Sequence, residues 1–392
     1  MNQDGESRDG ERGADDEQSS QVDAVTDGVG RGETGRTSRR GFLATAAATG
    51  ALALAGCVGG GDGPLTVSTW SGTNLGVFRE TIKPLYEEET GDEIEVVGNW
   101  ENILGQVRQS PADDPPFDLT VGSARDHYLG KQDGLWESIR YENVPNADSI
   151  KSTLTANIES EDGVPVAYGI MGYAYNADAI GFEPESWGDL VTNENAENVA
   201  LPGAYFLNSV IMAAIVADEA PMAEELYAED ARDVDAIFET MGEMPISKFY
   251  NGAADMWTAI SQGIADAGQY FFAYTVAKAA ETEETNLGVS VPERTVGYVD
   301  HYQVARGTGN RTQAEEFIDF LLREDVQTTY AEAFNLGMAN ENATHPERTR
   351  AELPIANDDL EENVVFKQYD RIAEAAPNLN ERFKQFQTEY QS

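Results

Sequence analysis

The chain has 392 residues, of which 70 are Asp or Glu and 26 are Lys or Arg, so its formal net charge is −44. With 41% hydrophobic residues it can still bury a core, and its length predicts roughly two or three domains of about 150 residues each. So large an acidic excess excludes a basic nucleic-acid-binding surface or a polybasic membrane patch as the main function. Only seven of the cationic residues are Lys. This composition suits molar salt, where the Debye length falls to about 3 Å, and it indicates a halophilic protein.

The amino terminus has the pattern of an export signal. The first 38 residues are polar and almost free of aliphatic side chains, so we expect a disordered leader. Arg39 and Arg40 then precede an uncharged run over 41–56, which is too short and too weakly apolar for a membrane-spanning helix of about 20 residues. The pattern favours secretory targeting, and the paired arginines resemble the twin-arginine signal, which exports proteins already folded.

Cys57 is the only cysteine, so an intramolecular disulfide and a cysteine-based zinc site are excluded. The Leu-Ala-Gly-Cys run over 54–57 resembles a lipobox, in which cleavage leaves the cysteine as the lipid-bearing first residue. A Gly-rich tether over 57–63 follows it directly. The alternative is a buried cysteine in an ordinary helix. Since residues 1–56 hold ten acidic and six basic side chains, residues 57–392 keep a net charge of −40, and the acidity belongs to the folded part.

From residue 64 onward, patterns of strands and helices alternate. In chain order we expect a strand over 65–70, a helix with Leu75, Phe78, Ile82 and Leu85 on one face, a strand over 93–97, a helix over 103–108, a strand over 117–121, an extended segment over 164–176, a helix or loop followed by a strand over 190–202, helices over 208–217, 223–241 and 253–264, strands over 265–274, 287–291 and 296–305, a helix over 312–334 and a packing helix from Leu379 to Tyr390. The alternation predicts an α/β fold with a parallel sheet. Ligands on such sheets bind at the carboxyl ends of the strands, which here are Trp70 and Ser123.

The sequence holds little that a catalytic or metal site requires. His127, His301 and His345 are its only histidines, and none has a second His four residues further on. It has no GxSxG elbow, no Walker A loop and no GxGxxG after a strand. Pairs among 70 carboxylates are uninformative, because an acidic run is usually a solvated face. We therefore expect no enzyme, no cofactor and no metal, and an extracellular hydrolase with an acidic pair is the least supported alternative.

Several motifs follow one another in an order typical of one family. They are the strand ending in Trp70, Tyr-Glu-Glu-Glu-Thr-Gly over 86–91, Phe-Asp-Leu over 117–119 leading to Ser123, and the runs over 164–169, 173–176, 187–190 and 317–322. Together with the lipoprotein signal, and over nearly all of 64–392, they resemble the extracellular solute-binding proteins of ABC importers. The spermidine/putrescine-binding group is closest, with the iron- and thiamine-binding groups next.

The resemblance implies a two-lobed periplasmic-binding-protein-like α/β fold with hinge-crossing strands, which closes over a solute held in the cleft. It places lobe 1 at 64–165 plus 290–335 and lobe 2 at 166–289 plus 336–392. The implied partners are a small polar solute and the permease and ATPase of the importer, with no nucleic acid. We expect a monomer that is anchored to the outer face of the cell membrane by lipid alone.

In the polyamine-binding group, aromatic rings flank the alkyl chain of the solute and carboxylates hold its ammonium groups. Carried over by position, the resemblance implies a ligand site of Trp70, Ser123, Arg125, Tyr205, Phe271, Tyr298 and Asp300. Asp300 is the implied amine ligand, since an acid inside a β-rich run is uncommon without a partner. The alternatives are a core tryptophan at Trp70, a helix cap at Ser123, a buried strand aromatic at Phe271 and a surface arginine at Arg125.

The sequence departs from the polyamine-binding pattern in two places. The loop over 202–206 is neutral where that group has two further carboxylates, and Arg125 stands where a tyrosine is expected. A cation at the cleft edge repels a polyamine and favours a carboxylate, phosphate or sulfonate. An iron receptor would use paired tyrosines, for which Tyr298 and Tyr302 are candidates. Thiamine, iron or an organic anion therefore remain alternative ligands, and a surface lipoprotein that binds a partner instead of a solute is the second class of function.

Overall fold

The computed structural model describes residues 63–100, 102–155, 163–189, 197–218, 233–282 and 286–390. From Gly63 on, the described residues form one compact unit. Arg39, Arg40 and Cys57, on which the export and lipid expectations depend, lie outside the described residues, as does the first part of the helix expected over 223–241. In the described ranges, no helix is both long enough and apolar enough to cross a membrane.

The described strands join in the order β2-β1-β3-β10-β5-β8-β6-β7, with β9 and β11 beside β5 and with β4 and β12 beside β10. Their bounds are β1 Leu65–Trp70, β2 Ile94–Asn99, β3 Leu119–Gly122, β4 Trp136–Glu137, β5 Val164–Asn176, β6 Val199–Pro202, β7 Ile246–Tyr250, β8 Ala267–Phe271, β9 Leu287–Ser290, β10 Thr295–Ala305, β11 Gly337–Met338 and β12 Val364–Phe366. The expected parallel pairing is present between β1 and its neighbours β2 and β3 and between β6 and its neighbours β7 and β8. The β10 strand instead pairs antiparallel with β3 and β5.

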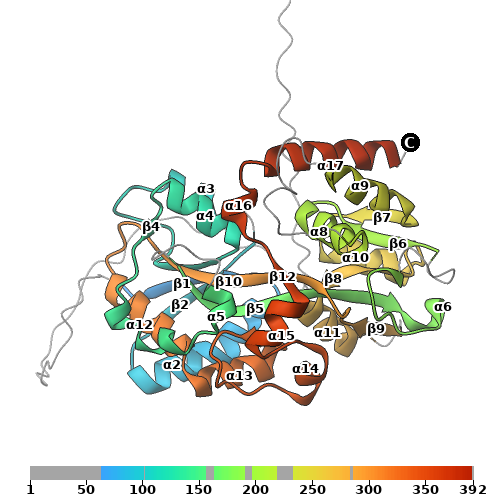
Figure 1. Cartoon of the computed structure of the whole chain (residues 1–392). Coiled ribbons are helices and arrows are strands. Elements are labelled where there is room, and N and C mark those ends of the chain that lie inside the picture. Colours follow the sequence, from blue (N-terminus) through green and yellow to red (C-terminus); the bar gives the residue numbers. More distant parts are fainter. Residues whose placement is uncertain are drawn as a thin grey trace, which may run out of the picture. The chain divides into compact units, whose positions relative to one another are not determined.

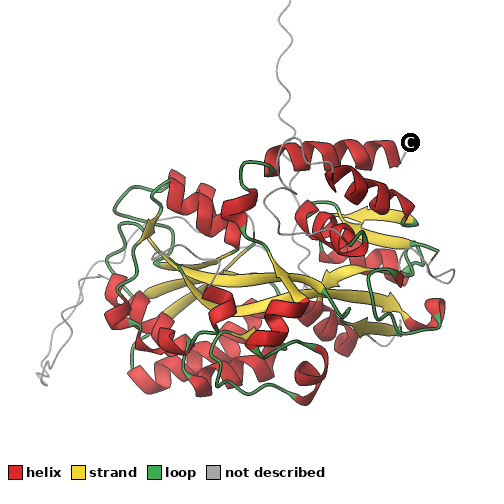
Figure 2. Cartoon of the chain, viewed as in Figure 1, coloured by secondary structure: helices red, strands yellow, loops and turns green. Residues whose placement is uncertain are grey.

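Helices pack around these strands (Figure 2). The α-helices are α1 Thr73–Val77, α2 Lys83–Thr90, α3 Ile103–Gln109, α4 Ala124–Gln132, α5 Ser152–Thr155, α6 Ala177–Ile180, α8 Phe206–Val216, α9 Asp233–Glu243, α10 Ala253–Ser261, α11 Phe272–Glu281, α12 Arg311–Leu321, α13 Glu324–Phe334, α14 Glu347–Glu352, α15 Asn357–Asn363, α16 Tyr369–Ile372 and α17 Ala376–Tyr390. A π-helical turn, Phe78–Ile82, joins α1 to α2, and 3-10 turns lie at Tyr141–Asn143 and Pro145–Ser149.

Two long strands, β5 and β10, run through both lobes (Figure 1). The first part of β5 pairs with β10, and its second part, from Met171 on, pairs with β8 and β9. Both faces of β5 are covered, because nearly all of its side chains are buried. This explains why its sequence is almost continuously apolar instead of alternating. The expected two-lobed α/β fold with crossing strands is confirmed.

Each lobe has its own apolar core. The first core includes Phe78, Leu119 and Phe317, and the second includes Trp187, Ile211 and Phe383. Buried side chains from Leu336 to Phe366 pack mainly in the first core. The segment expected to begin lobe 2 at residue 336 therefore packs mainly with lobe 1 as far as Phe366, and the chain returns to the second core with α16 and α17.

Three expected elements differ in the structure. The strand expected over 265–274 ends at Phe271, and Tyr274 lies in α11. The sequence did not indicate this boundary, because no Gly or Pro marks the change from strand to helix. The helix expected over 312–334 is two helices, since Arg323 has an extended backbone with φ −63° and ψ 143°. Leu85, expected on the buried face of the first helix, is 38% exposed, and its neighbour Tyr86 is buried instead. Three helical turns take about eleven residues, so Tyr86, and not Leu85, lies on the same face as Leu75.

Candidate functional site

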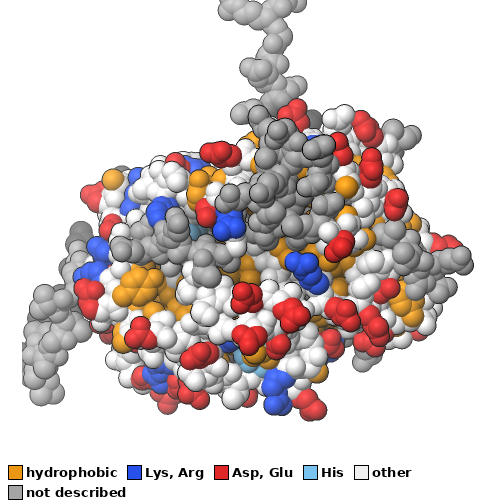
Figure 3. All heavy atoms as spheres, viewed as in Figure 1, with side chains coloured by type: hydrophobic (Ala, Val, Ile, Leu, Met, Phe, Trp, Pro, Cys, Tyr) orange, Lys and Arg blue, Asp and Glu red, His pale blue; other side chains and the backbone are white. Residues whose placement is uncertain are grey.

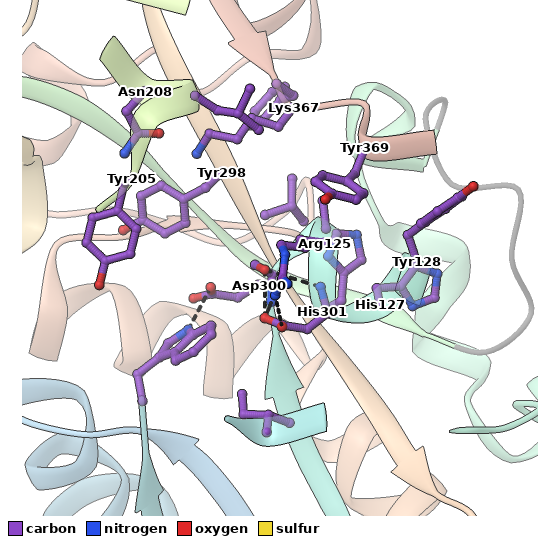
Figure 4. A pocket seen from close by; sticks show the side chains of 18 of the residues that line it. Arg125, His127, Tyr128, Tyr205, Asn208, Tyr298, Asp300, His301, Lys367 and Tyr369 are labelled. Atoms are coloured by element: carbon purple, nitrogen blue, oxygen red, sulfur yellow. Dashed lines mark hydrogen bonds and ion pairs between the residues drawn. The ribbon is translucent and has the colours of Figure 1, made fainter. Parts of the chain in front are cut away.

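A cavity of about 640 Å³ lies between the lobes, a size suited to a small molecule. Its lining comes from the carboxyl ends of β1 and β3, from the residues at the start of α8, from the β8–α11 junction and from β10. All seven positions expected from the sequence line this cavity: Trp70, Ser123, Arg125, Tyr205, Phe271, Tyr298 and Asp300. Figure 4 shows how several of their side chains converge.

Aromatic rings form one wall of the cavity. Trp70 packs edge-to-face on Trp100 with ring centroids 5.7 Å apart, and Trp100 packs in the same way on Tyr274 at 6.0 Å. Phe271 packs edge-to-face on Tyr298 at 5.3 Å and on Tyr205 at 6.0 Å. Such pairs fix the orientation of the rings, and aromatic rings that line a cavity can contact the alkyl chain or the cationic group of a ligand.

Asp300 is the buried carboxylate of this wall. It lies in β10 with 3% of its surface exposed, and Trp70 Nε1 donates a hydrogen bond of 2.8 Å to its Oδ1. The pairing of β10 with β5 shifts register directly after it, an irregularity that can re-aim a side chain next to a binding site. Burial raises the pKa of Asp300 to about 7, and the hydrogen bond from Trp70 acts against this rise. The carboxylate therefore lacks a counter-charge in the described protein, and a cationic group would provide one.

Tyr298 occupies its position because Gly169 lies opposite it on β5. A Cβ atom on Gly169 would come within 2.1 Å of Tyr298 Oη, so any larger residue would displace the ring. The hydroxyls of Tyr298 and Tyr274 are buried, and neither has a hydrogen-bond partner among the described residues. Two hydroxyl groups on the cavity wall are thus available to a ligand.

Ser123 and Arg125 lie at the start of α4. Ser123 caps that helix in a capping box with Asp126, and its hydroxyl donates to Asp126 Oδ2 at 2.7 Å. The helix-cap alternative for Ser123 is therefore correct, although the residue also lines the cavity. The side chain of Arg125 is 58% exposed, and its Nη1 lies 3.7 Å from Asp126 Oδ1. Arg125 therefore stands at the mouth of the cavity and keeps much of its charge available.

The structure does not bring together Tyr298 and Tyr302, the candidate tyrosine pair for the iron alternative. Tyr302 is buried against Phe78, its Oη lies 3.3 Å from Thr69 Oγ1, and it does not line the cavity. Two tyrosines four residues apart on one strand share a face, but only Tyr298 lines the space between the lobes. Among the described residues there is also no group of three or more His, Cys, Asp or Glu side chains arranged to hold a metal.

Several residues that line the cavity were not predicted as ligand-site residues from the sequence: Trp100, His127, Tyr128, Asn208, His301 and Lys367. Trp100 had a detectable signal, because it directly follows β2 as Trp70 ends β1, and parallel neighbours bring their carboxyl ends to one edge. His127 and His301 stack with ring centroids 5.3 Å apart. Burial and the neighbouring His127 lower the pKa of His301 to about 3, so this side chain is neutral.

Trp100 also connects the lobes. Its Nε1 donates a hydrogen bond of 2.7 Å to Tyr205 Oη, which precedes α8 in the second lobe. No local pattern predicts this contact, because the two residues lie 105 positions apart.

The fold and this interlobe cavity define a class of binding proteins. The family model for bacterial extracellular solute-binding proteins matches residues 83–355, and the chain belongs to this family. This confirms the resemblance seen in the sequence. Members of the family bind solutes and are not enzymes.

Solved structures share the fold over most of their length. An ABC transporter substrate-binding protein from Bradyrhizobium japonicum is 17% identical, with a TM-score of 0.70 over 83% of this chain and 99% of that chain. A spermidine/putrescine ABC transporter substrate-binding protein from Streptococcus pneumoniae, in complex with calcium and HEPES, is 17% identical, with a TM-score of 0.66 over 82% and 99%. A binding protein from A. tumefaciens R10 in complex with agropinic acid is 17% identical, with a TM-score of 0.63 over 83% and 98%. Comparison with curated proteins finds no match.

Proposed function

We propose that this protein is the lipid-anchored receptor of an ABC importer and that it delivers a small polar solute bearing an amine to a membrane permease. The observation that carries the proposal is Asp300, a buried carboxylate held by Trp70 inside an aromatic cavity to which both lobes contribute. A cationic group placed there gains a charge-assisted hydrogen bond and aromatic faces. Closure of the lobes then shields the solute from water.

A polyamine is less well supported as the solute than the importer role is as the function. A structural relative is a spermidine/putrescine-binding protein, whereas another was solved with agropinic acid, so the fold accepts more than one solute class. In this chain the carboxylates that line the cavity within the described residues are Asp126, Asp300 and Asp370. Asp126 is used in the α4 cap and Asp370 is exposed. One buried carboxylate suits one ammonium group better than several.

The proposal is tested by identifying the ligand that the purified protein retains. Native mass spectrometry in volatile salt, followed by denaturing release, reports any retained solute, and thermal shift in molar KCl screens polyamines, thiamine, iron and organic anions. A solute at 100 times its Kd stabilises the folded protein by about 2.7 kcal/mol. Asp300→Asn should abolish the shift, whereas the exposed-surface control Asp358→Asn should keep it. If no solute is retained and none stabilises the protein, the receptor proposal fails, and an interaction lipoprotein becomes the better description.

Lipid anchoring at Cys57 and export through Arg39 and Arg40 are part of the proposal and rest on the sequence alone. Cys57→Ser should move the exported protein from the membrane fraction to the medium. Replacing both arginines with lysine should retain it inside the cell. A Cys57→Ser protein that stays with the membrane would contradict the anchor.

We also propose that the protein works in high salt as a monomer. Figure 3 shows Asp and Glu side chains spread over the visible face instead of gathered in one patch. Their mutual repulsion is screened at molar ionic strength and grows as salt is removed. The melting temperature should therefore fall steadily as KCl is lowered from about 3 M, where the Debye length is under about 3 Å, and a flat salt dependence would contradict this adaptation.

A further inference from the structure

Lys367 lines the cavity directly after β12. It makes no ion pair or hydrogen bond with any residue in the ranges that the structure describes. In Figure 4 its amine points toward Asn208 and Tyr298. The chain has 70 acidic side chains and only seven lysines, so an unpaired lysine directed into the binding cavity stands out against the composition.

The sheet places Lys367 on the same wall as Asp300. Gly297 of β10 pairs with Phe366 of β12 in parallel register, so the next residue, Lys367, falls beside Tyr298. Residues in register share a face of the sheet, and Tyr298 and Asp300 share theirs because they are two apart. The Cα atoms of Lys367 and Asp300 are then about 8 Å apart from strand rise and spacing. Figure 4 shows the ring of Tyr298 between the two charged side chains.

Neither charge is compensated by the other. Burial lowers the pKa of Lys367 to about 8, and no carboxylate acts against it. Burial likewise raises the pKa of Asp300 to about 7, opposed only by the indole N–H of Trp70. Each group is thus partly desolvated without a counter-charge, a costly arrangement unless a ligand supplies one.

We propose that the solute is an amino-acid-like zwitterion, whose cationic group is bound by Asp300 and Trp70 and whose anionic group is bound by Lys367. This rests on the proposed function as a solute receptor and deepens it. Tyr298 lies in register beside Lys367, and its hydroxyl lies over Gly169 of β5. An ammonium group carries three donors, so Lys367 can hold an anion and also serve Asn208 Oδ1, which is buried and has no described partner.

The alternatives place like charges together. A diamine would bring its second ammonium group to Lys367, and a dicarboxylate would bring its second carboxylate to Asp300. Like charges in a desolvated site repel by several kcal/mol in other binding sites, which is enough to reject such ligands. A solute with one positive and one negative group supplies a counter-charge to both Asp300 and Lys367.

Three five-carbon probes test this inference, because they differ only in their terminal charges: 5-aminopentanoate, 1,5-diaminopentane and pentanedioate. Affinity is measured by calorimetry with the full exported chain in molar KCl at pH 7.5, between the pKa of Asp300, about 7, and that of Lys367, about 8. We expect 5-aminopentanoate to bind at least tenfold more tightly than either other probe. Lys367→Met should weaken it by about 10- to 100-fold, the loss of one hydrogen bond to a charged group, while diamine binding stays equal or improves.

Controls separate a binding role from a structural one. Lys367→Arg keeps the cation and should retain the preference for the zwitterion, and Lys384→Gln, an exposed lysine on α17 outside the cavity, should change nothing. Tighter binding of the diamine, or an equal loss for all probes in Lys367→Met, would overturn the inference and leave the receptor function intact. A retained solute without an anionic group would also overturn it. If no probe binds and no solute is retained, the receptor function itself fails.

Discussion

Trp70 and Asp300 are joined by a hydrogen bond of 2.8 Å that links the end of β1 to the middle of β10, 230 residues further along the chain. The bond has two effects on the site. It orients the carboxylate toward the cavity, and it stabilises the ionised form of an acid that burial would otherwise keep protonated. The aromatic ring and the charge that receive the solute are therefore one coupled unit.

Trp70→Phe tests this coupling, because it keeps a ring and removes the N–H donor. The pKa of Asp300 should rise further, so less carboxylate is present at neutral pH. We expect the affinity for an amine-bearing solute to fall about tenfold at pH 7 and to recover in part at pH 8.5. Calorimetry at the two pH values measures this. Trp257→Phe, on α10 outside the cavity, is the matched control and should bind as the parent does.

The stability of the ligand-free protein should depend on pH through Asp300. Its folded pKa of about 7 lies above its ordinary value of 3.8, so the folded state binds the proton more tightly than the unfolded state. The contribution is complete below pH 3.8 and is lost as the pH rises through 7. Tyr274, Tyr298 and Tyr302 add no charge in this window, because burial keeps their pKa values raised.

Asp300→Asn should therefore stabilise the empty protein above pH 7 by up to roughly 4 kcal/mol relative to the parent, with a difference that shrinks toward pH 4. Chemical unfolding in constant molar salt measures the difference between the two proteins. The same variant should lose affinity for the solute. A stability difference that does not change between pH 4 and pH 8 would show that Asp300 does not titrate in this window.

The bond from Trp100 to Tyr205 should favour the closed state, because it joins residues of the two lobes at 2.7 Å. Trp100→Phe removes this bond, whose net value is about 1 kcal/mol, and should weaken solute binding about fivefold. Small-angle scattering of the ligand-free protein should show a larger radius of gyration for Trp100→Phe than for the parent. Tyr205→Phe removes the same bond and should give the same result. Two variants that bind as the parent does would place the contact outside the closing motion.

Gly169→Ala should displace the Tyr298 ring, since the new Cβ would lie 2.1 Å from its Oη. We expect a loss of about 1–3 kcal/mol in unfolding free energy and a loss of solute affinity of at least tenfold. Gly76→Ala is the opposing control: its Cβ meets nothing within 4 Å and it lies in α1, so it should stabilise the protein by up to about 1 kcal/mol. Similar effects at both glycines would contradict the proposed role of Gly169.

The sequence predicted the fold through local patterns and motif order. The strands over 65–70 and 164–176 have the predicted bounds, because each apolar run is bounded by turn or helix signals. The change from strand to helix at Phe271 was missed, since buried aromatic residues fit both structures and only packing decides between them. The break at Arg323 between α12 and α13 was missed for a related reason, because both helices bury the same face of one apolar pattern.

Composition and motif order along the chain determined the acidity of this protein, its solute-binding class, its two α/β lobes and seven of the residues that line the cavity. These properties can be predicted from the sequence because each depends on local patterns or on the spacing of motifs. Only the tertiary structure decided how the charges meet. The tertiary structure joined Trp70 to Asp300, placed Gly169 under Tyr298 and brought Lys367 to the same wall. These contacts depend on strand register between residues far apart in the chain, which lie 230 positions apart for Trp70 and Asp300. Residues 57–392 carry a net charge of −40, whereas the described lining of the cavity includes one buried acid, Asp300, and one unpaired lysine, Lys367.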